Sequence, residues 1–446
     1  MAYTYPAGLY TDVRIEHVFS THISYTLREL EECREKRYSA AFIRVYDGDR
    51  WYYASTSDLD SIQTEIDALA TLAQPNGSLA ESDVYKRLSE QTDSVLVYAD
   101  KAVSAVPLDD KIALAQSAMP GLEGNAYIKL WNVRYLDEYK RKEFYSSKGA
   151  NLTFDYQRCG ISCGFQMADG DARFREAYQL GRDDFSALRG FEDEMRALIE
   201  ECEHYLKHSV AVEPGVYTVV LAPIVTGVFA HECFGHKSES DFMVGDEEAK
   251  KEWALGKKLG SDELSIIDTG TRHDAGYVPY DDEGSKAGMT YLIKGGVLTG
   301  RLHNSVSAAD LGEEVTGNGR AMSYEYEPIV RMTSTYIDKG SKTKEQIIGE
   351  VEHGILVKDI SHGSGMSTFT LAPSLAYYIR NGKIAEPVRI SVVSGSVFEA
   401  LSDIDGISDT VEHSAFVTGG CGKMEQYPLA VGMGGPYIRV KNMNVQ

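Results

Sequence analysis

The feature that most constrains the fold is an alternation of apolar and polar residues between Asn125 and Met167. Tyr, Ile, Val, Trp and Phe alternate with polar residues here, as in strands that bury one face of a sheet. Glycine is frequent, at 41 of 446 residues, and many glycines occur in short turns between apolar runs. The stretch therefore predicts successive antiparallel strands in a β-rich chain with tight connections.

Helical patterns accompany these strands in the first half of the chain. The segment from Asp183 to His208 carries apolar residues at steps of three and four, which predicts an amphipathic helix. Another helix is expected after Ser57, a residue type that caps helix N-termini, and before the breaker Pro75-Asn76-Gly77. We predict an N-terminal α+β domain over residues 1–212, ending where Glu213-Pro214-Gly215 breaks the helical pattern.

Hairpins dominate the remaining residues, 213–446. The segment Tyr291–Ile293 turns at Lys294-Gly295-Gly296, and a similar hairpin turns at Asn381-Gly382. The predicted fold class is α+β: the N-terminal α+β domain is followed by a mainly antiparallel β C-terminal domain. This second domain carries a short helix with the histidine motif described below.

Charge and hydropathy exclude several classes of protein. Lys and Arg total 45 against 67 Asp and Glu, and the net charge of −22 repels polyanions, so we expect no nucleic-acid or anionic-membrane partner. The longest apolar run, Tyr217 to Ala230, is too short to cross a bilayer and predicts a buried strand that enters a turn. Residues Met1 to Leu27 lack a signal-peptide pattern, and the six cysteines are scattered. We expect a cytoplasmic protein.

A metal-binding pattern follows the apolar run from Tyr217 to Ala230, in the form His231-Glu232-x-x-x-His236. On a regular helix, a spacing of five separates the two imidazoles by about 140°, at roughly 100° per residue. Both reach one metal only if the helix loosens or ends before His236, and Gly235 permits such a break. The motif is therefore not that of an ordinary zincin helix. Two histidines near a glutamate also occur as plain polar residues at a helix end, but a preceding strand from Val216 to Val225 favours a site.

A zinc site needs a third protein ligand, with the fourth position left to water. Cys421 is the candidate, in the glycine-rich segment Thr418-Gly419-Gly420-Cys421-Gly422-Lys423, where Lys423 would favour the thiolate. Sequence spacing alone favours a simple buried thiol at this position.

Several separated motifs, in one order, resemble the TldD/PmbA family of metallopeptidases, also called modulators of DNA gyrase. They cover most of the second half and comprise His231–His236, Asp281-Asp282-Glu283-Gly284, Thr316–Arg320, Pro328–Tyr336, Asn381-Gly382-Lys383, Cys421-Gly422-Lys423 and Val431-Gly432. The resemblance implies a TldD-like, metal-bearing chain in which His231, His236 and Cys421 bind Zn²⁺ and Glu232 is the catalytic carboxylate. Gly420, where the family usually has threonine, is a departure near the metal.

The resemblance also implies an activity and partners. Family members trim leader segments from peptides, degrade unfolded polypeptides, and work as two-subunit assemblies. We therefore predict a zinc-dependent peptidase for unfolded or extended peptides, acting as a homodimer or as a heterodimer with a PmbA-type subunit. The alternatives are a non-catalytic peptide-binding or regulatory subunit with a structural zinc, and a regulator that binds gyrase or DNA.

Further residues are assigned more weakly. His303, Arg320 and His413 are candidates for stabilising the oxyanion of the reaction. Asp241, five residues after His236, is a candidate to orient that imidazole, although an exposed loop carboxylate fits equally well. The segment Thr316–Arg320, with Asn318 and Arg320, is interpreted as lining for an extended peptide.

Overall fold

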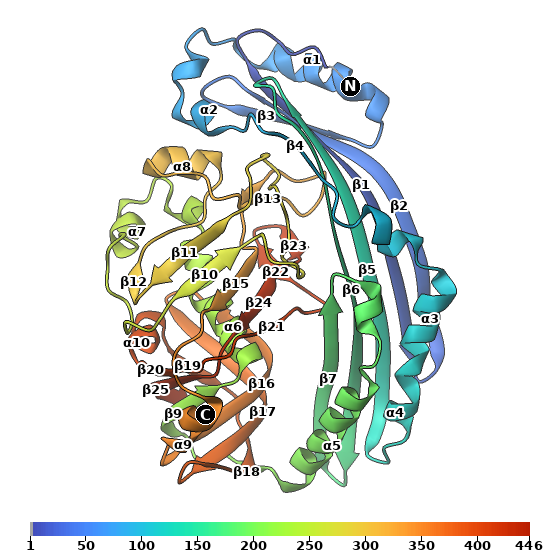
Figure 1. The fold of residues 1–446 in the computed structure, drawn as a ribbon, viewed down its shortest axis with the longest axis vertical. Helices are drawn as coiled ribbons and strands as arrows, with labels where there is room; N and C mark the ends of the chain where they lie inside the picture. Colours follow the sequence, from blue (N-terminus) through green and yellow to red (C-terminus); the bar gives the residue numbers. More distant parts are fainter. Residues whose placement is uncertain (1–2) are drawn as a thin grey trace.

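The computed structural model describes residues 3–446, and it divides into two halves that face each other (Figure 1). A long curved sheet forms one wall, and two smaller sheets with short helices form the other. This mixture of helices and largely antiparallel strands confirms the predicted α+β class.

The first half is built on seven strands in the order β3-β2-β1-β5-β6-β4, with β7 paired to β6. The alternation between Asn125 and Met167 is confirmed as the two longest strands, β5 and β6, which pair antiparallel. Their odd-numbered residues face the core with the helices, and their even-numbered residues face the second half of the molecule. The strands are β1 (Tyr10–Thr26), β2 (Glu29–Tyr46), β3 (Trp51–Thr56), β4 (Thr92–Val95), β5 (Ile128–Ser146), β6 (Asn151–Asp169) and β7 (Ala172–Arg182).

Most helices of this half cover the core face of this sheet, and their boundaries differ from the predicted ones. The helix predicted from Asp183 begins at Glu192, because the segment Phe185–Leu188 forms a separate 3₁₀ turn. The helix predicted after Ser57 starts with a 3₁₀ turn whose cap is Asp58, which accepts a hydrogen bond from the backbone of Asp60. The helices are α1 (Ile62–Leu72), α2 (Asp83–Arg87), α3 (Leu108–Ser117), α4 (Met119–Glu123) and α5 (Glu192–His208).

The second half contains a closed ring of five strands. The pairings run β16-β9-β25-β19-β17, and β17 pairs back to β16; β18, β8 and β20 extend the ring. Both predicted hairpins are confirmed, as β11–β12 and β17–β18. The strands are β8 (Val210–Ala211), β9 (Gly215–Leu221), β16 (His353–Gly365), β17 (Thr368–Arg380), β18 (Lys383–Arg389), β19 (Val393–Ser396), β20 (Ile404–Ile407) and β25 (Ile438–Val445).

A second sheet packs beside the ring, in the order β12-β11-β10-β15-β24-β21. Its strands are β10 (Ile266–Thr269), β11 (Met289–Lys294), β12 (Val297–Leu298), β15 (Ser334–Ile337), β21 (Glu412–Ser414) and β24 (Gly432–Gly435). Two short pairs complete the half: β13 (Gly319–Arg320) with β14 (Ile329–Val330), and β22 (Cys421–Lys423) with β23 (Gln426–Leu429). The helices are α6 (Pro223–Ala230), α7 (Glu247–Glu252), α8 (Ser305–Leu311), α9 (Lys344–Gly349) and α10 (Val397–Ser402).

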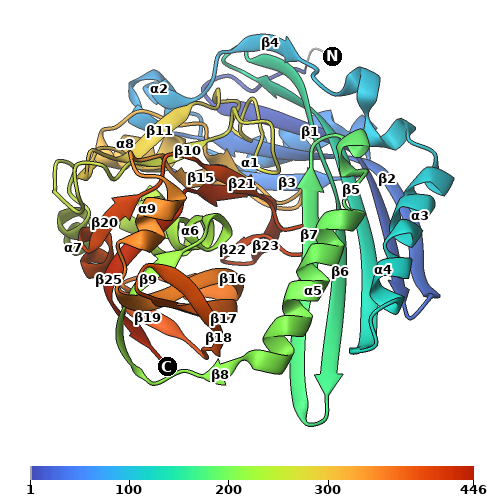
Figure 2. The same cartoon turned by 60° about the horizontal axis from the view of Figure 1, so that its bottom comes forward.

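Helix α6 lies between the ring and this second sheet (Figure 2). The strand predicted from Val216 to Val225 ends at Leu221, and a helix begins at Pro223. Proline fixes φ and lacks an N–H, which suits the first turn of a helix and excludes a central strand. Gly227 lets α6 approach β24, because a Cβ there would lie 2.7 Å from the amide nitrogen of Gly434.

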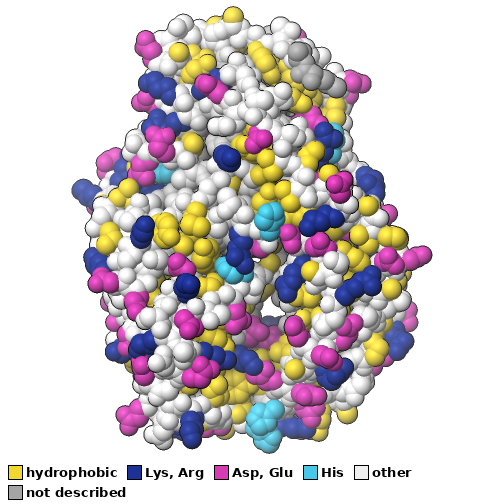
Figure 3. Space-filling view, viewed as in Figure 1, with side chains coloured by type: hydrophobic (Ala, Val, Ile, Leu, Met, Phe, Trp, Pro, Cys, Tyr) yellow, Lys and Arg dark blue, Asp and Glu magenta, His cyan; other side chains and the backbone are white. Residues whose placement is uncertain are grey.

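The two halves meet at both ends of the long sheet. At one end, a hydrophobic cluster joins α5 and the sheet to β16 and β17. At the other, the buried Arg44 of β2 pairs with Asp12 at 2.7 Å and with Glu283 of the second half at 2.8 Å. The surface is hollowed between the halves in the face shown by Figure 3. The division after residue 212 stays a proposal.

Within residues 3–446, the helices are too short or too polar to cross a membrane.

Candidate metal centre

The histidine motif forms a π-helical turn directly after α6. Residues His231–Gly235 are π-helical, and the backbone N–H of His236 donates to the carbonyl of His231. This i→i+5 hydrogen bond closes a turn over five residues, so side chains five apart come to the same side. The predicted loosening of the helix is therefore confirmed.

Gly235 acts differently from the prediction. Its backbone is right-handed helical, at φ −57 and ψ −52, so the chain does not break there. The glycine supplies room instead, because a Cβ would lie 2.0 Å from Sδ of Met332. The widened turn can pack against Met332 only without a side chain at this position.

The turn brings three candidate ligands together. One donor atom each of His231, His236 and Cys421 lies within 4.8 Å of the others. Sγ of Cys421 is 3.6 Å from Nε2 of His236, and the two imidazole ring centres are 5.0 Å apart. The buried Nδ1 of His231 has no hydrogen-bond partner among the described residues. Two imidazoles and a thiol with a free buried nitrogen form a donor set that suits Zn²⁺.

Cys421 reaches this position on the short hairpin of β22 and β23. The buried guanidinium of Arg331 donates to the carbonyl oxygens of Cys421, at 2.7 Å, and Gln426, at 3.2 Å. Gly420, just before the cysteine, has φ +155, and a Cβ there would lie 2.6 Å from the carbonyl oxygen of Leu429. The hairpin is thus fixed by main-chain contacts on both sides of the thiol.

The electrostatics of the cluster favour a thiolate. Burial opposes ionisation of Cys421, but the adjacent His231 and His236 outweigh it and hold the pKa of the thiol well below its usual range. Burial opposes protonation of His236, but hydrogen bonds to Cys421 and Glu239 raise its pKa to about 10. Without a metal, the two groups form an imidazolium–thiolate pair. Lys423, predicted to favour the thiolate, forms ion pairs with Glu239 and Asp241.

The partner that orients His236 is Glu239, not Asp241. Oε2 of the fully buried Glu239 lies 3.1 Å from Nδ1 of His236, which leaves Nε2 directed at Cys421. Asp241 instead accepts hydrogen bonds from Lys423 Nζ, at 2.5 Å, and from the backbone of Val330, at 3.1 Å. The prediction failed because Asp241 lies after the chain has turned, on a separate 3₁₀ segment, Ser240–Met243.

Glu232 lies at the edge of the cluster and lines a cleft of about 540 Å³. Burial raises the pKa of this carboxyl above its usual value, although the neighbouring histidines oppose the shift. The same cleft is lined by consecutive residues of β7, Arg175–Ala177, and by His231 and Cys421. The carboxylate and the candidate ligands therefore share one cleft between the two halves.

His303 and His413 do not line this cleft. Both ring nitrogens of His303 are engaged, by Ser240 Oγ at 2.8 Å and Glu313 Oε2 at 2.9 Å, inside a buried polar network. His413 lies on β21 against the ring of Tyr336, and burial lowers its pKa to about 4. Neither imidazole is placed to contact a group bound at the cluster, which corrects both predictions.

Asn318 and Arg320 are also structural in the fold. The amide of Asn318 donates to Asp268, at 2.9 Å, and to the carbonyl of Arg331, at 3.0 Å. Arg320 donates to the carbonyl oxygens of Met332 and Ala430. Because β13 is paired to β14 and both side chains are buried, the segment Thr316–Arg320 does not line the cleft of the cluster.

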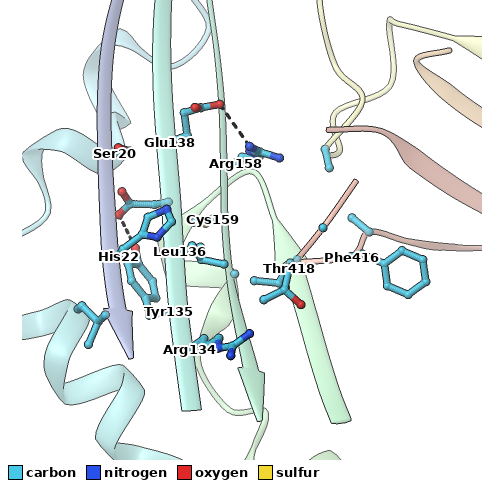
Figure 4. Close-up of a pocket in the computed structure, with 18 of the residues that line it drawn as sticks. Ser20, His22, Arg134, Tyr135, Leu136, Glu138, Arg158, Cys159, Phe416 and Thr418 are labelled. Atoms are coloured by element: carbon cyan, nitrogen blue, oxygen red, sulfur yellow. Dashed lines mark hydrogen bonds and ion pairs between the residues drawn. The ribbon is translucent and has the colours of Figure 1, made fainter. Parts of the chain in front are cut away.

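A strap, residues Ala415–Gly420, crosses from β21 to β22 and separates this cleft from a cavity of about 730 Å³. Figure 4 shows Phe416 and Thr418 of the strap beside side chains of the long sheet, where Glu138 pairs with Arg158. The backbone N–H of Val417 donates to Gln179 at 3.1 Å. The strap connects the long sheet directly to Cys421.

Glycines make room for the strap. Gly160 of β6 and Gly181 of β7 pair across the sheet. A Cβ at Gly160 would lie 2.6 Å from Val417, and one at Gly181 would lie 3.1 Å from the carbonyl oxygen of Ala415. This contact could not be predicted from the sequence, because two glycines in separate strands carry no signal of what packs on them. Glu239 could have been predicted, since a carboxylate three residues after His236 is a usable signal.

The comparisons with known proteins agree with this architecture. A sequence model of the PmbA/TldA metallopeptidase C-terminal domain matches residues 214–446, and one of domain 1 of the same metallopeptidases matches residues 11–74. The chain is 32% identical to a metalloprotease of Synechocystis sp., over 98% of this chain and 94% of that protein. It is 28% identical to a zinc metalloprotease TldD homolog of Saccharolobus solfataricus, over 98% and 96%.

A solved structure shares the fold. The crystal structure of TldE from Thermococcus kodakarensis superposes with a TM-score of 0.77 and 17% identity, covering 98% of this chain and 96% of that one. The long sheet facing a compact β-rich half is thus a shared architecture. With the C-terminal match over residues 214–446, this chain belongs to the PmbA/TldD family of metallopeptidases.

Proposed function

We propose that this chain is a zinc-dependent peptidase that hydrolyses unfolded or extended peptides. The observation that carries the proposal is the cluster of His231, His236 and Cys421, with Glu232 beside it in the same cleft. Two imidazoles and one thiolate would hold Zn²⁺ and leave a position for water, as in catalytic zinc sites. When bound, Zn²⁺ acidifies that water and polarises the scissile carbonyl.

Glu232 is the proposed general base. Its raised pKa matches a group that takes a proton from the attacking water and returns it to the leaving amine. Glu239 keeps Nε2 of His236 directed at the cluster through its contact with Nδ1.

The shape of the cleft supports an extended substrate. In the described sheet, β7 pairs with β6 alone, so its other edge is free. Consecutive residues Arg175–Ala177 line the cleft, which is expected when the edge of a strand faces it. A peptide that adds to this edge would be held mainly by main-chain hydrogen bonds, with little dependence on its side chains.

The main alternative is a non-catalytic subunit with a structural zinc. Structural zinc sites are usually closed by four protein ligands, whereas the cluster in residues 3–446 consists of three donors. This observation favours a catalytic site. A cytoplasmic location and a dimer, with a second copy or with a PmbA-type subunit, remain part of the proposal.

The test is the zinc content and the hydrolysis of an unfolded peptide for the wild type and Glu232→Gln. We expect the variant to keep its zinc and to lose about 10²–10⁴-fold in activity. Glu247→Gln, an exposed glutamate of α7, is the matched control and should behave as the wild type. Full activity in zinc-loaded Glu232→Gln would contradict the mechanism. If the wild type by itself does not hydrolyse the peptide, the assay is repeated with a PmbA-type subunit added.

A further inference from the structure

Lys423 occupies an unusual place between the two segments that carry the candidate ligands. It lies two residues after Cys421 on β22, where Cys421 and Lys423 are buried and Gly422 is exposed. Its side chain is only 2% exposed. A lysine is rarely buried to this degree unless its charge is paired.

The ammonium group of Lys423, on the Cys421 hairpin, contacts carboxylates that follow the His231–His236 turn. Nζ lies 3.3 Å from Oε2 of Glu239, 2.5 Å from Oδ1 of Asp241 and 2.8 Å from the carbonyl oxygen of Val330. The same Oε2 of Glu239 lies 3.1 Å from Nδ1 of His236. A continuous chain of contacts therefore runs from the hairpin of Cys421, through Lys423 and Glu239, to His236.

This arrangement has a mechanical consequence. The hairpin and the π-helical turn are separated by 185 positions between His236 and Cys421, and no covalent constraint fixes their spacing. Lys423 links them through ion pairs with the fully buried Glu239 and with Asp241, and its charge balances that of Glu239. Without Lys423, the buried Glu239 would lose its ammonium partner; loss of one partner from a buried ion pair is costly, so the contact of Glu239 with Nδ1 of His236 would weaken.

We propose that Lys423 is a positioning residue of the metal centre: it holds the Cys421 hairpin against the His231–His236 turn and keeps Glu239 on His236. The inference rests on the proposed zinc site. Arg331 also restrains the hairpin, but its hydrogen bonds to Cys421 and Gln426 go to main-chain carbonyl oxygens, whereas Lys423 contacts the carboxylate that holds His236.

The test is a zinc titration of the metal-free full-length protein against a competing chelator, for the wild type and Lys423→Met. We expect the affinity for Zn²⁺ to fall about 10–100-fold, as for other residues that support metal ligands. With Co²⁺ in place of Zn²⁺, the thiolate-to-metal absorption band should weaken, because Cys421 is no longer held in place. Lys250→Met is the matched control: that lysine is also paired to two carboxylates, but at the exposed helix α7, and its loss should change neither readout.

A double-mutant cycle with Glu239→Gln separates positioning from general destabilisation. If Lys423 acts through Glu239, the double variant should bind Zn²⁺ no more weakly than Lys423→Met alone. Additive losses would overturn the proposed route, as would a Lys423→Met protein that melts at a lower temperature yet binds Zn²⁺ with wild-type affinity. If Lys423→Met does not fold, Lys423→Gln takes its place with the same expectation. A wild type that binds no Zn²⁺ would instead overturn the proposed function itself.

Discussion

Sγ of Cys421 lies 3.6 Å from Nε2 of His236, although 185 positions separate the two residues in the chain. The imidazole presents Nε2 to the thiol because Nδ1 is engaged by Glu239 at 3.1 Å. This contact joins two structures that are distant in the chain, a π-helical turn and a short hairpin. The candidate metal centre exists only where they meet.

Removal of the metal should destabilise the protein. A ligand that binds only the native state stabilises it by about 2.7 kcal/mol at a concentration 100 times its Kd. We expect chelation to lower the melting temperature and added Zn²⁺ to restore it in the wild type. Cys421→Ser should lose most of this response, because one of the three donors is replaced by a poor zinc ligand. An identical zinc-dependent shift in the variant would argue against Cys421 as a ligand.

Gly235→Ala should destabilise the fold. The added Cβ would lie 2.0 Å from Sδ of Met332, and overpacking of this kind costs about 1–3 kcal/mol. Urea denaturation measures the loss, and Met332→Ala in the same chain should recover part of it, since it removes the clashing sulfur. Gly77→Ala, where no atom lies within 4 Å of the added Cβ, is the control. A stable Gly235→Ala protein would mean that the π-helical turn does not pack as described.

Gly160→Ala should displace the strap. The new Cβ would meet Val417 at 2.6 Å and the carbonyl oxygen of Leu180 at 2.9 Å, and the strap leads directly to Cys421. We expect weaker zinc binding and a loss of peptidase activity beyond any loss of stability. Val417→Ala in the same chain should restore part of both. The strap has no role in the site if zinc affinity and activity stay unchanged in folded Gly160→Ala.

His303→Gln should affect stability rather than catalysis. The imidazole bridges Ser240 and Glu313 in a buried network, and leaving such groups unpaired costs about 1–3 kcal/mol. The rate constant kcat should stay close to that of the wild type, because His303 does not line the cleft. Loss of an oxyanion-stabilising group would instead lower kcat by about 10²–10³-fold. Steady-state kinetics on the folded variant distinguish the two roles.

The stability of the protein should depend on pH through Glu176, which lines the cleft. Burial and the charge of Asp359 raise the pKa of Glu176 to about 7 from an ordinary value of 4.5, while burial raises that of Asp359 to about 6. The nearby Lys358 is already paired with Glu201 at 2.5 Å. Because the native state binds the proton more tightly, this contribution to the free energy of unfolding is fully present below about 4.5 and is lost as the pH rises through about 7.

Urea denaturation at a series of pH values measures this dependence. Glu176→Gln should reduce the fall in stability between about pH 4.5 and 7, since residue 176 then has no proton to lose, while the part carried by Asp359 remains. Glu247→Gln, at an exposed position, should keep the wild-type slope. An unchanged slope in Glu176→Gln would show that another group carries the pH dependence.

Much of the fold was predictable from local patterns. The alternation between Asn125 and Met167 predicted β5 and β6, because the two-residue period of a strand can be seen in consecutive residues. The hairpin at Asn381-Gly382 was predictable for the same reason, from its turn residues. Where the predictions failed, a local signal had been misjudged: Pro223 starts a helix, and Asp58 rather than Ser57 caps the turn before α1. The closed ring of strands and the facing of the two halves depend on pairings between distant segments, which no local pattern contains.

For the metal centre, too, some features follow from the sequence and others depend on the fold. The residue spacing alone shows that His231 and His236 cannot share a face of a regular helix, because a spacing of five does not fit one. How they meet depends on the fold, through the i→i+5 hydrogen bond of a π-helical turn packed against Met332. It also decided that Glu239, and not Asp241, holds His236, since the direction of a side chain after a turn depends on what packs around it. Family resemblance identified Cys421 as a third candidate ligand. Its thiol lies near the two histidines because long-range packing, not sequence spacing, sets the distance between them.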